Sequence, residues 1–184
     1  MRPPALREAR FAAKTTHMKK VVLRYGGFGI LFLIVFSALS MATLNETSAY
    51  AELVGYLGIF LSMIFVFLGL RYYRDRVNGG VLRFGQGLKL GLLIVLLPAI
   101  GFGLFDVLYT RVINPSWFAH YSEQMQQKMT AAEKAQFVEQ MNFMQQYPLA
   151  EFALMASSVL LIGVIVTIIS TLALMRKPKQ QLSV

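Results

Sequence analysis

The sequence predicts an all-α fold: an integral membrane bundle of four transmembrane helices with a short amphipathic helical pair in the outer loop. The first observation is composition, since 56% of the 184 residues are hydrophobic and the mean hydropathy is +0.55. Soluble domains contain roughly 45–50% apolar residues. The second is distribution: the apolar residues gather in four blocks of about 20 residues, the length at which a helix crosses a hydrocarbon core of about 30 Å.

The chain divides into a membrane domain and two tails. Residues 1–18 form a basic N-terminal tail that is predicted to be disordered, because chain ends are poorly ordered unless something ties them down. Met18 precedes two lysines and apolar sequence, so translation starts at Met1 and at Met18 are both consistent with the sequence. The predicted membrane domain covers residues 19–177, and residues 178–184 form a C-terminal tail.

The first spanning helix is predicted over about residues 25–44, which carry no charge. The preceding bases and the small residues at 49–51 also fit a cleaved signal sequence, but the apolar run exceeds the roughly 7–15 residues of a signal core. The second spanning helix is predicted over about residues 53–70. Its short connection to the first makes the two helices antiparallel neighbours.

The connection that follows residue 70 is rich in arginine and contains Asn78-Gly79, which is typical of a tight turn. An irregular turn at the membrane surface is favoured here over a small hairpin through Val81, Leu82 and Phe84. The third spanning helix is predicted over about residues 88–109. It contains Pro98, which removes one helical hydrogen bond and predicts a kink.

The long outer loop, residues 114–147, is predicted to form two short amphipathic helices. Asn114-Pro115 is typical of one helix start, and Thr130 followed by Glu133 matches a capping box at the other. Methionine and aromatic residues recur there at helical spacing, which favours a face that lies on the membrane or caps the bundle; a partner-binding face is the alternative. The fourth spanning helix is predicted over about residues 149–175, with Pro148 in its first turn.

Lysine and arginine are distributed very unequally between the two sides of these helices. Fifteen flank one side and three flank the other, and cytoplasmic flanks are the ones enriched in basic residues. The sequence therefore predicts cytoplasmic N- and C-termini and an external helical loop. The larger set is Arg2, Arg7, Arg10, Lys14, Lys19, Lys20, Arg24, Arg71, Arg74, Arg76, Arg83, Lys89, Arg176, Lys177 and Lys179, and the smaller is Arg111, Lys128 and Lys134.

Small residues recur along three of the predicted helices. Helices in lipid gain little from hydrophobic burial against each other, so close contact through small residues supplies much of their association. These rows predict a compact bundle, with a dimer interface as the alternative. The predicted packing positions are Gly55, Gly58, Ser62, Gly69, Gly87, Gly91, Pro98, Ala156, Gly163 and Ser170.

Four polar residues are candidates for structural or functional contacts. Asp106 is expected to pair with Arg111, and Glu151 is favoured by the dipole at the start of the fourth helix. His120 lies one helical turn before Glu123 and has ligand chemistry suited to a divalent metal. A single histidine without an HxxxH or HExxH pattern usually packs or is solvated, so no metal site is predicted.

Composition and motifs exclude most classes of function. The chain has no cysteine, which excludes disulfides, thiolate zinc sites and cysteine nucleophiles. Ser157 and Ser158 have no partnered base. Basic residues follow the ends of the apolar blocks rather than one soluble surface, so the lipid bilayer, and not nucleic acid, is the expected partner. No catalytic residue and no cofactor are predicted.

The predicted function is a non-enzymatic one, in which the protein acts through packing with itself or with another membrane protein. The alternative is a subunit of a small oligomeric transporter or channel. That alternative rests on Pro98 between glycines and on the polar row Ser157, Ser158, Thr167, Ser170 and Thr171 of the fourth helix.

Three segments carry a resemblance to a known family: MKKVVLRYGG at 18–27, YRDRVNGGVLRFGQGLKLGLL at 73–93 and NFMQQYPLAEF at 142–152. With them, residues 18–177 resemble a bacterial membrane family catalogued as domain of unknown function 4199. The resemblance implies a four-helix, multi-pass protein of the bacterial inner membrane. It implies no activity and adds no catalytic residue.

Overall fold

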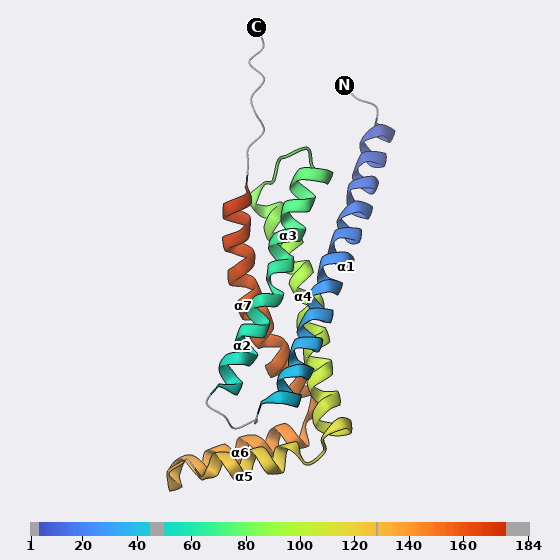
Figure 1. Ribbon diagram of the computed structural model, residues 1–184. Helices are drawn as coiled ribbons and strands as arrows, with labels where there is room; N and C mark the ends of the chain where they lie inside the picture. Colours follow the sequence, from blue (N-terminus) through green and yellow to red (C-terminus); the bar gives the residue numbers. More distant parts are fainter. Residues whose placement is uncertain (1–3, 45–49, 128, 176–184) are drawn as a thin grey trace.

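The computed structural model describes residues 4–44, 50–127 and 129–175, with side chains from residue 15 onward. Four helical segments in this part of the chain are long and apolar enough to cross a membrane: Thr15–Thr43, Ala51–Val77, Phe84–Ile113 and Pro148–Leu174. They run alternately in opposite directions, so the start of the first and the end of the last lie at the same end of the bundle (Figure 1). This confirms the predicted all-α membrane bundle.

The first helix, α1, covers Pro4–Thr43 and is therefore much longer than the predicted span. The prediction of a disordered tail is wrong for residues 4–18, which continue the helix. They contain mainly alanine, arginine, lysine and other strong helix formers and, after Pro4, neither proline nor glycine. Extending an existing helix needs no new nucleus. Residues 1–3, the link 45–48 and the tail 178–184 lie outside the described residues.

The second span is interrupted, although the sequence predicted one continuous helix. It consists of α2 (Ala51–Ser62), α3 (Ile64–Tyr72) and a π-helical turn, η1 (Tyr73–Val77). At the break, the Ser62 hydroxyl donates to the Ile59 carbonyl at 2.7 Å. Such local side-chain bonds compete with the helical ladder and bend helices.

The connection to the third span is the irregular turn that the sequence favoured. Gly79 and Gly80 both have positive φ, at 64° and 78°, a conformation that glycine adopts without strain. The side-chain Nδ2 of Asn78 donates to the Val81 carbonyl at 2.6 Å and stabilises the turn. Leu82 then enters the core and is fully buried.

The third span begins directly after this turn. It consists of α4 (Phe84–Leu108) and a second π-helical turn, η2 (Tyr109–Ile113). Pro98 is buried inside α4. A Cβ added at Gly29 of α1 would lie 3.5 Å from the Cγ atom of the Pro98 ring, which is ordinary van der Waals contact. The third span is thus extended by four residues at each end relative to the prediction.

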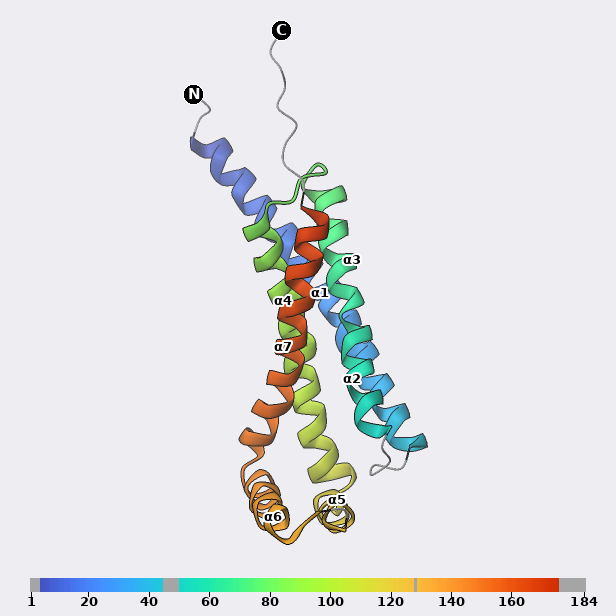
Figure 2. The ribbon, with the colours of Figure 1, turned by 90° about the vertical axis from the view of Figure 1, so that its left-hand side faces the viewer.

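The predicted amphipathic pair is present as α5 (Trp117–Gln126) and α6 (Ala131–Gln146). The two helices lie side by side across the end of the bundle, perpendicular to its long axis (Figures 1 and 2). The predicted capping box at Thr130 and Glu133 is confirmed. The fourth span, α7 (Pro148–Leu174), follows with its proline in the first turn, as predicted.

Helix α5 starts later than the Asn114-Pro115 pair predicted. The Asn114 carbonyl accepts a hydrogen bond from the Trp117 amide at 3.0 Å, which closes a turn before the helix begins. The Ser116 hydroxyl donates to the Asn114 side-chain oxygen at 3.0 Å. The proline therefore belongs to the turn and not to the first turn of the helix.

Helices α4 and α7 form the most extensive helix contact in the described bundle. The two helices are antiparallel, and their small residues meet in a ladder of contacts. From one contact to the next, the residue number rises by four on α4 and falls by four on α7. Thr171 lies against Gly87, Thr167 against Gly91, and Gly163 against Val95. A side chain added at any of these glycines would come within 2.5 Å of its neighbour. The small residues of both helices are therefore used inside one chain.

The remaining predicted packing residues, with one exception, also face the interior. Gly58 lies against Phe36 of α1, and Gly69 lies between Ile94 and Tyr25. Ser62, Ala156 and Ser170 are buried. The exception is Gly55, where an added side chain would meet nothing within 4 Å. Within the chain, Gly55 is therefore not the packing residue that was predicted, because no other helix lies close to it at this level.

The bundle is tight at one end and spread at the other. Figure 2 shows α1 and α2 together on one side and α4 and α7 on the other, diverging toward α5 and α6. The Gly87 and Gly91 contacts hold α4 to α7 along the tight end. We call the spread end, where α5 and α6 lie, the outer end.

Candidate functional site

A buried carboxylate organises the outer end of the bundle. Glu151 is in the first turn of α7 and is only 2% exposed. The Thr110 hydroxyl donates to its Oε1. The Arg111 guanidinium donates to its Oε2 from Nη2 at 2.9 Å and from Nε at 3.3 Å. A buried carboxylate is tolerated only when it is paired and hydrogen-bonded in this way.

Arg111 also connects the spanning helices to the helical pair. It donates to the backbone carbonyls of Met144, at 2.8 Å, and Gln145, both in the last turn of α6. Its guanidinium lies 5.5 Å from the ring of Phe118 on α5. One side chain on η2 thereby holds α5, α6 and the start of α7 together.

The expected pair of Asp106 and Arg111 is wrong, because Arg111 pairs with Glu151 instead. The two residues are five positions apart, and helical neighbours that share a face are three or four apart. Glu151 is forty positions away in sequence, but the antiparallel α7 brings it to the same level. Local sequence spacing therefore did not predict Glu151 as the partner of Arg111.

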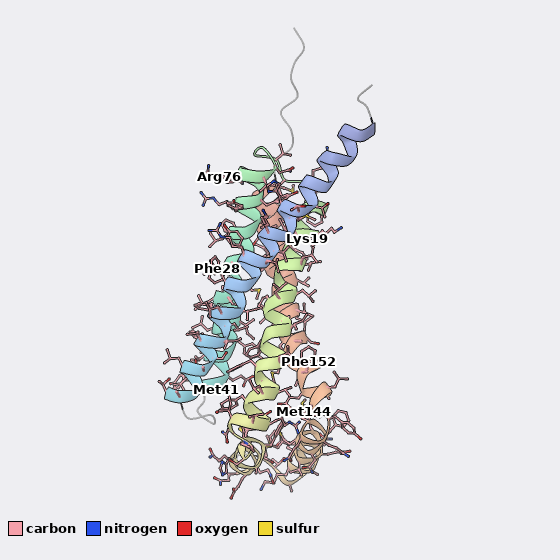
Figure 3. All side chains as sticks on the ribbon, turned by 90° about the vertical axis from the view of Figure 1, so that its right-hand side faces the viewer. Lys19, Phe28, Met41, Arg76, Met144 and Phe152 are labelled. Carbon is pink, nitrogen blue, oxygen red and sulfur yellow. The ribbon has the colours of Figure 1, made fainter. Side chains whose placement is uncertain are left out.

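A cavity of about 360 Å³ lies beside this cluster. Residues of α1, α2, α4, α5, α6 and α7 line it, and most of them are apolar, such as Phe36, Met41, Phe102 and Met141. It is open on part of its surface, since Gly55, which lines it, is exposed. Figure 3 shows Met41 and Met144, which also line it, at the end opposite Lys19 and Arg76. We call it the outer cavity.

Three carboxyl groups line the outer cavity: Glu52 from α2, Asp106 from α4 and Glu151 from α7. Asp106 is half-buried and lies close enough to Glu151 to interact with it electrostatically. Glu52 is exposed. Among the described residues that line the cavity there is no lysine, arginine or histidine. Arg111 pairs with Glu151 but does not line the cavity. The described lining therefore contains acidic side chains and no basic one.

Aromatic side chains close the cavity from the side of α5. Trp117 and Tyr121 stack with ring centroids 4.8 Å apart and an interplanar angle of 9°. Burial, and second the nearby Glu52 carboxylate, raise the pKa of Tyr121 above its usual value of 10.0. Tyr121 therefore stays a neutral phenol at neutral pH. Glu52 of α2 and Tyr121 of α5 line the same cavity.

His120 lies away from this cluster, on the exposed surface of α5. Glu123 is also exposed and lines a separate, more polar hollow between α5 and α6. Within residues 15–44, 50–127 and 129–175, no group of three His, Asp or Glu side chains is placed to hold a metal. The structure thus joins Arg111, Glu151 and Asp106 in one cluster and leaves His120 outside it.

Sequence reasoning missed the cavity and two of its polar residues, Glu52 and Tyr121. One signal was present: an acidic residue lies at the outer end of each of the three helices that supply Glu52, Asp106 and Glu151. Because successive spans alternate in direction, these ends meet at one level. This pattern predicts that the three acids lie at the same depth in the membrane. Whether the helices that carry them pack tightly or diverge at that depth depends on their tertiary contacts.

Comparison with known proteins identifies a family without assigning an activity. Residues 24–176 match the model of a family described as "Protein of unknown function (DUF4199)". No curated protein and no solved structure matches the chain.

Proposed function

Since the chain belongs to the DUF4199 family, whose function is unknown, we propose from its geometry that it is a non-enzymatic membrane protein that binds a membrane amphiphile in the outer cavity. The observation that carries this proposal is the cavity itself, about 360 Å³ in volume and lined mainly by apolar side chains. Ligand sites are typically concave, largely apolar and supplied with a few convergent polar groups. This description fits the outer cavity.

The polar groups near the cavity support binding rather than catalysis. Both carboxylate oxygens of Glu151 already accept hydrogen bonds, one from Thr110 and the other from Arg111. The Ser158 hydroxyl donates to the Leu154 carbonyl of its own helix at 3.0 Å, and Ser157 is exposed. A nucleophile needs an adjacent general base, and neither serine has one among the described residues.

The small-residue rows do not support the predicted self-association, because α4 and α7 use them on each other. The same contacts remove the support for a transport pathway along α7. Thr167 and Thr171 are buried against Gly91 and Gly87, which leaves no space between the helices at this depth. The predicted function named a second copy of the chain or another membrane protein as the partner, whereas the partner proposed here is an amphiphile of the membrane.

The tryptophan fluorescence of this chain offers a direct test of the proposal. Trp117 is the only tryptophan in the sequence and it lines the outer cavity. Titrating amphiphiles with brominated alkyl chains into the purified protein in detergent should quench its fluorescence saturably. Gly55→Phe, which adds a ring into open space at the cavity wall, should weaken the apparent affinity at least about tenfold, a loss that corresponds to roughly 1.4 kcal/mol.

Gly27→Phe is the matched control. It places the same ring on another membrane helix where an added side chain also meets nothing within 4 Å, but outside the cavity. Its Trp117 fluorescence should be quenched with the same apparent affinity as that of the unsubstituted protein. Linear quenching that does not saturate, and that is equal in both variants, would overturn the proposal.

We further propose that the outer cavity faces away from the cytoplasm, in a bacterial inner membrane. The distribution of the described basic residues supports this. Lys19 and Arg76 lie at the opposite, tight end (Figure 3), and Lys20, Arg24 and Arg71 are close to them in sequence. Only Arg111 and Lys134, of the described basic residues, belong to the outer end. The absence of cysteine from the sequence allows single-cysteine labelling. In intact bacterial cells, a membrane-impermeant maleimide should label Glu139→Cys on α6 and should label Arg76→Cys only after permeabilisation. The reverse pattern would contradict the orientation.

A further inference from the structure

We infer that the outer cavity selects amphiphiles whose polar head is a cation, such as a primary or quaternary ammonium. This inference rests on the proposed function and adds the chemical class of the ligand. It starts from the charge of the cavity wall. Three carboxyl groups line the cavity, and the described lining contains no basic side chain.

Only one of the three acids has a basic partner. Glu151 is paired with Arg111 at 2.9 Å, and this pair belongs to the framework that joins η2, α6 and α7. Asp106 and Glu52 are in no ion pair among the described residues. Asp106 of α4 lies beside the Glu151 carboxyl group, so a single arginine faces two adjacent acids. Glu52 of α2 lines the same cavity without a basic partner. The acids around the cavity therefore outnumber the one described base that is paired with them.

Their surroundings strengthen any interaction with a cation. Asp106 is half-buried, and charges interact more strongly where water is partly excluded. The stacked rings of Trp117 and Tyr121 on α5 line the same cavity as these acids. Aromatic rings attract cations through their negative faces and recur in sites for quaternary ammonium groups. An anionic head would instead meet like charges, which disfavours its binding.

The apolar part of the cavity accounts for the rest of the ligand. Phe36 and Met41 of α1, Phe102 of α4 and Met155 of α7 line it on the side of the spanning helices. Methionine side chains adapt to irregular apolar groups. An alkyl chain can occupy this part while a head group lies between Asp106 and Glu52, since these acids lie toward the outer ends of α4 and α2.

The test uses three brominated amphiphiles that share one alkyl chain and differ only in the head: a trimethylammonium, a neutral sugar and a sulfate. Quenching of Trp117 in the full chain, in neutral detergent, reports binding of each. We expect the ammonium compound to bind at least about tenfold more tightly than the sulfate, as opposed charges at a partly buried site permit.

Two substitutions test the role of the acids. Asp106→Asn and Glu52→Gln should each reduce the preference for ammonium over sulfate about threefold to tenfold, and the double variant should abolish it. Glu139→Gln on α6, an equivalent change at an exposed acid of the same end that does not line the cavity, should leave the preference unchanged. Retained binding of the neutral compound by every variant shows that the fold and the cavity are intact.

The possible outcomes separate the two proposals. If all three amphiphiles quench saturably with equal affinity, the inference about the head group is wrong and the binding function stands. If the preference for ammonium persists in the double variant, the assignment to Asp106 and Glu52 is wrong. If none quenches saturably, as expected for a cavity that takes a partner helix, both the proposed amphiphile binding and the inference fall.

Discussion

Gly91→Leu is expected to destabilise the bundle by about 3 kcal/mol or more, the upper part of the range for overpacked cores. An added Cβ at position 91 would lie 2.4 Å from the Thr167 Cγ2, and leucine adds three further carbons. The position is the middle of the ladder between α4 and α7, so neither helix can move away without losing the contacts above and below. Unfolding by sodium dodecyl sulfate, followed by circular dichroism in mixed micelles, measures the loss.

Two control variants make this result interpretable. Gly27→Leu adds the same side chain where an added Cβ meets nothing within 4 Å and should cost little. Thr167→Val keeps the shape of the threonine and removes a buried hydroxyl that has no hydrogen-bond partner, so it should be neutral or stabilising. Equal stability of Gly91→Leu and Gly27→Leu would show that α4 and α7 do not pack through this ladder.

The second large effect is expected for Arg111→Met, which should lower the free energy of unfolding by about 3–5 kcal/mol, the usual cost of removing one partner of a buried ion pair. Glu151 is 2% exposed, so its buried carboxylate would be left beside the Asp106 carboxyl group with only the Thr110 hydroxyl as a donor. The bonds to the Met144 and Gln145 carbonyls are lost as well. The same unfolding measurement applies.

A double variant separates the charge effect from the loss of contacts. Arg111→Met combined with Glu151→Gln removes both charges, and it should recover part of the lost stability because no unpaired charge remains buried. Lys134→Met, a basic-to-apolar change on the neighbouring α6, should be nearly neutral. A double variant that is less stable than Arg111→Met alone would contradict the assignment of Arg111 and Glu151 as a pair.

Much of this architecture was predictable because its causes are local. Each spanning segment is identified by its apolar length, with charged residues only near its ends, since lipid cannot satisfy a polar side chain or an unpaired backbone group. The capping box at Thr130 and Glu133 involves neighbours three positions apart, and Pro148 starts a helix through its own fixed φ. Such features do not depend on where the rest of the chain lies.

The features that define the site depend on distant parts of the chain. Gly55 and Gly58 are three positions apart on α2, but only Gly58 lies against another helix. Arg111 has an acid five positions before it and binds one forty positions after it. Small residues permit close approach without specifying which helix approaches, and a carboxylate attracts any cation within reach.

The four membrane segments, their order and the capped helical pair therefore follow from the amino-acid sequence alone, because hydrophobic length and capping act within a few residues of the chain. The partner of each small residue, the ion pair of Glu151 and the divergence of α1 and α2 from α4 and α7 follow only from the assembled bundle. The outer cavity is a product of that divergence. Its position is set by which helices reach van der Waals contact and which do not, and no local pattern encodes this choice.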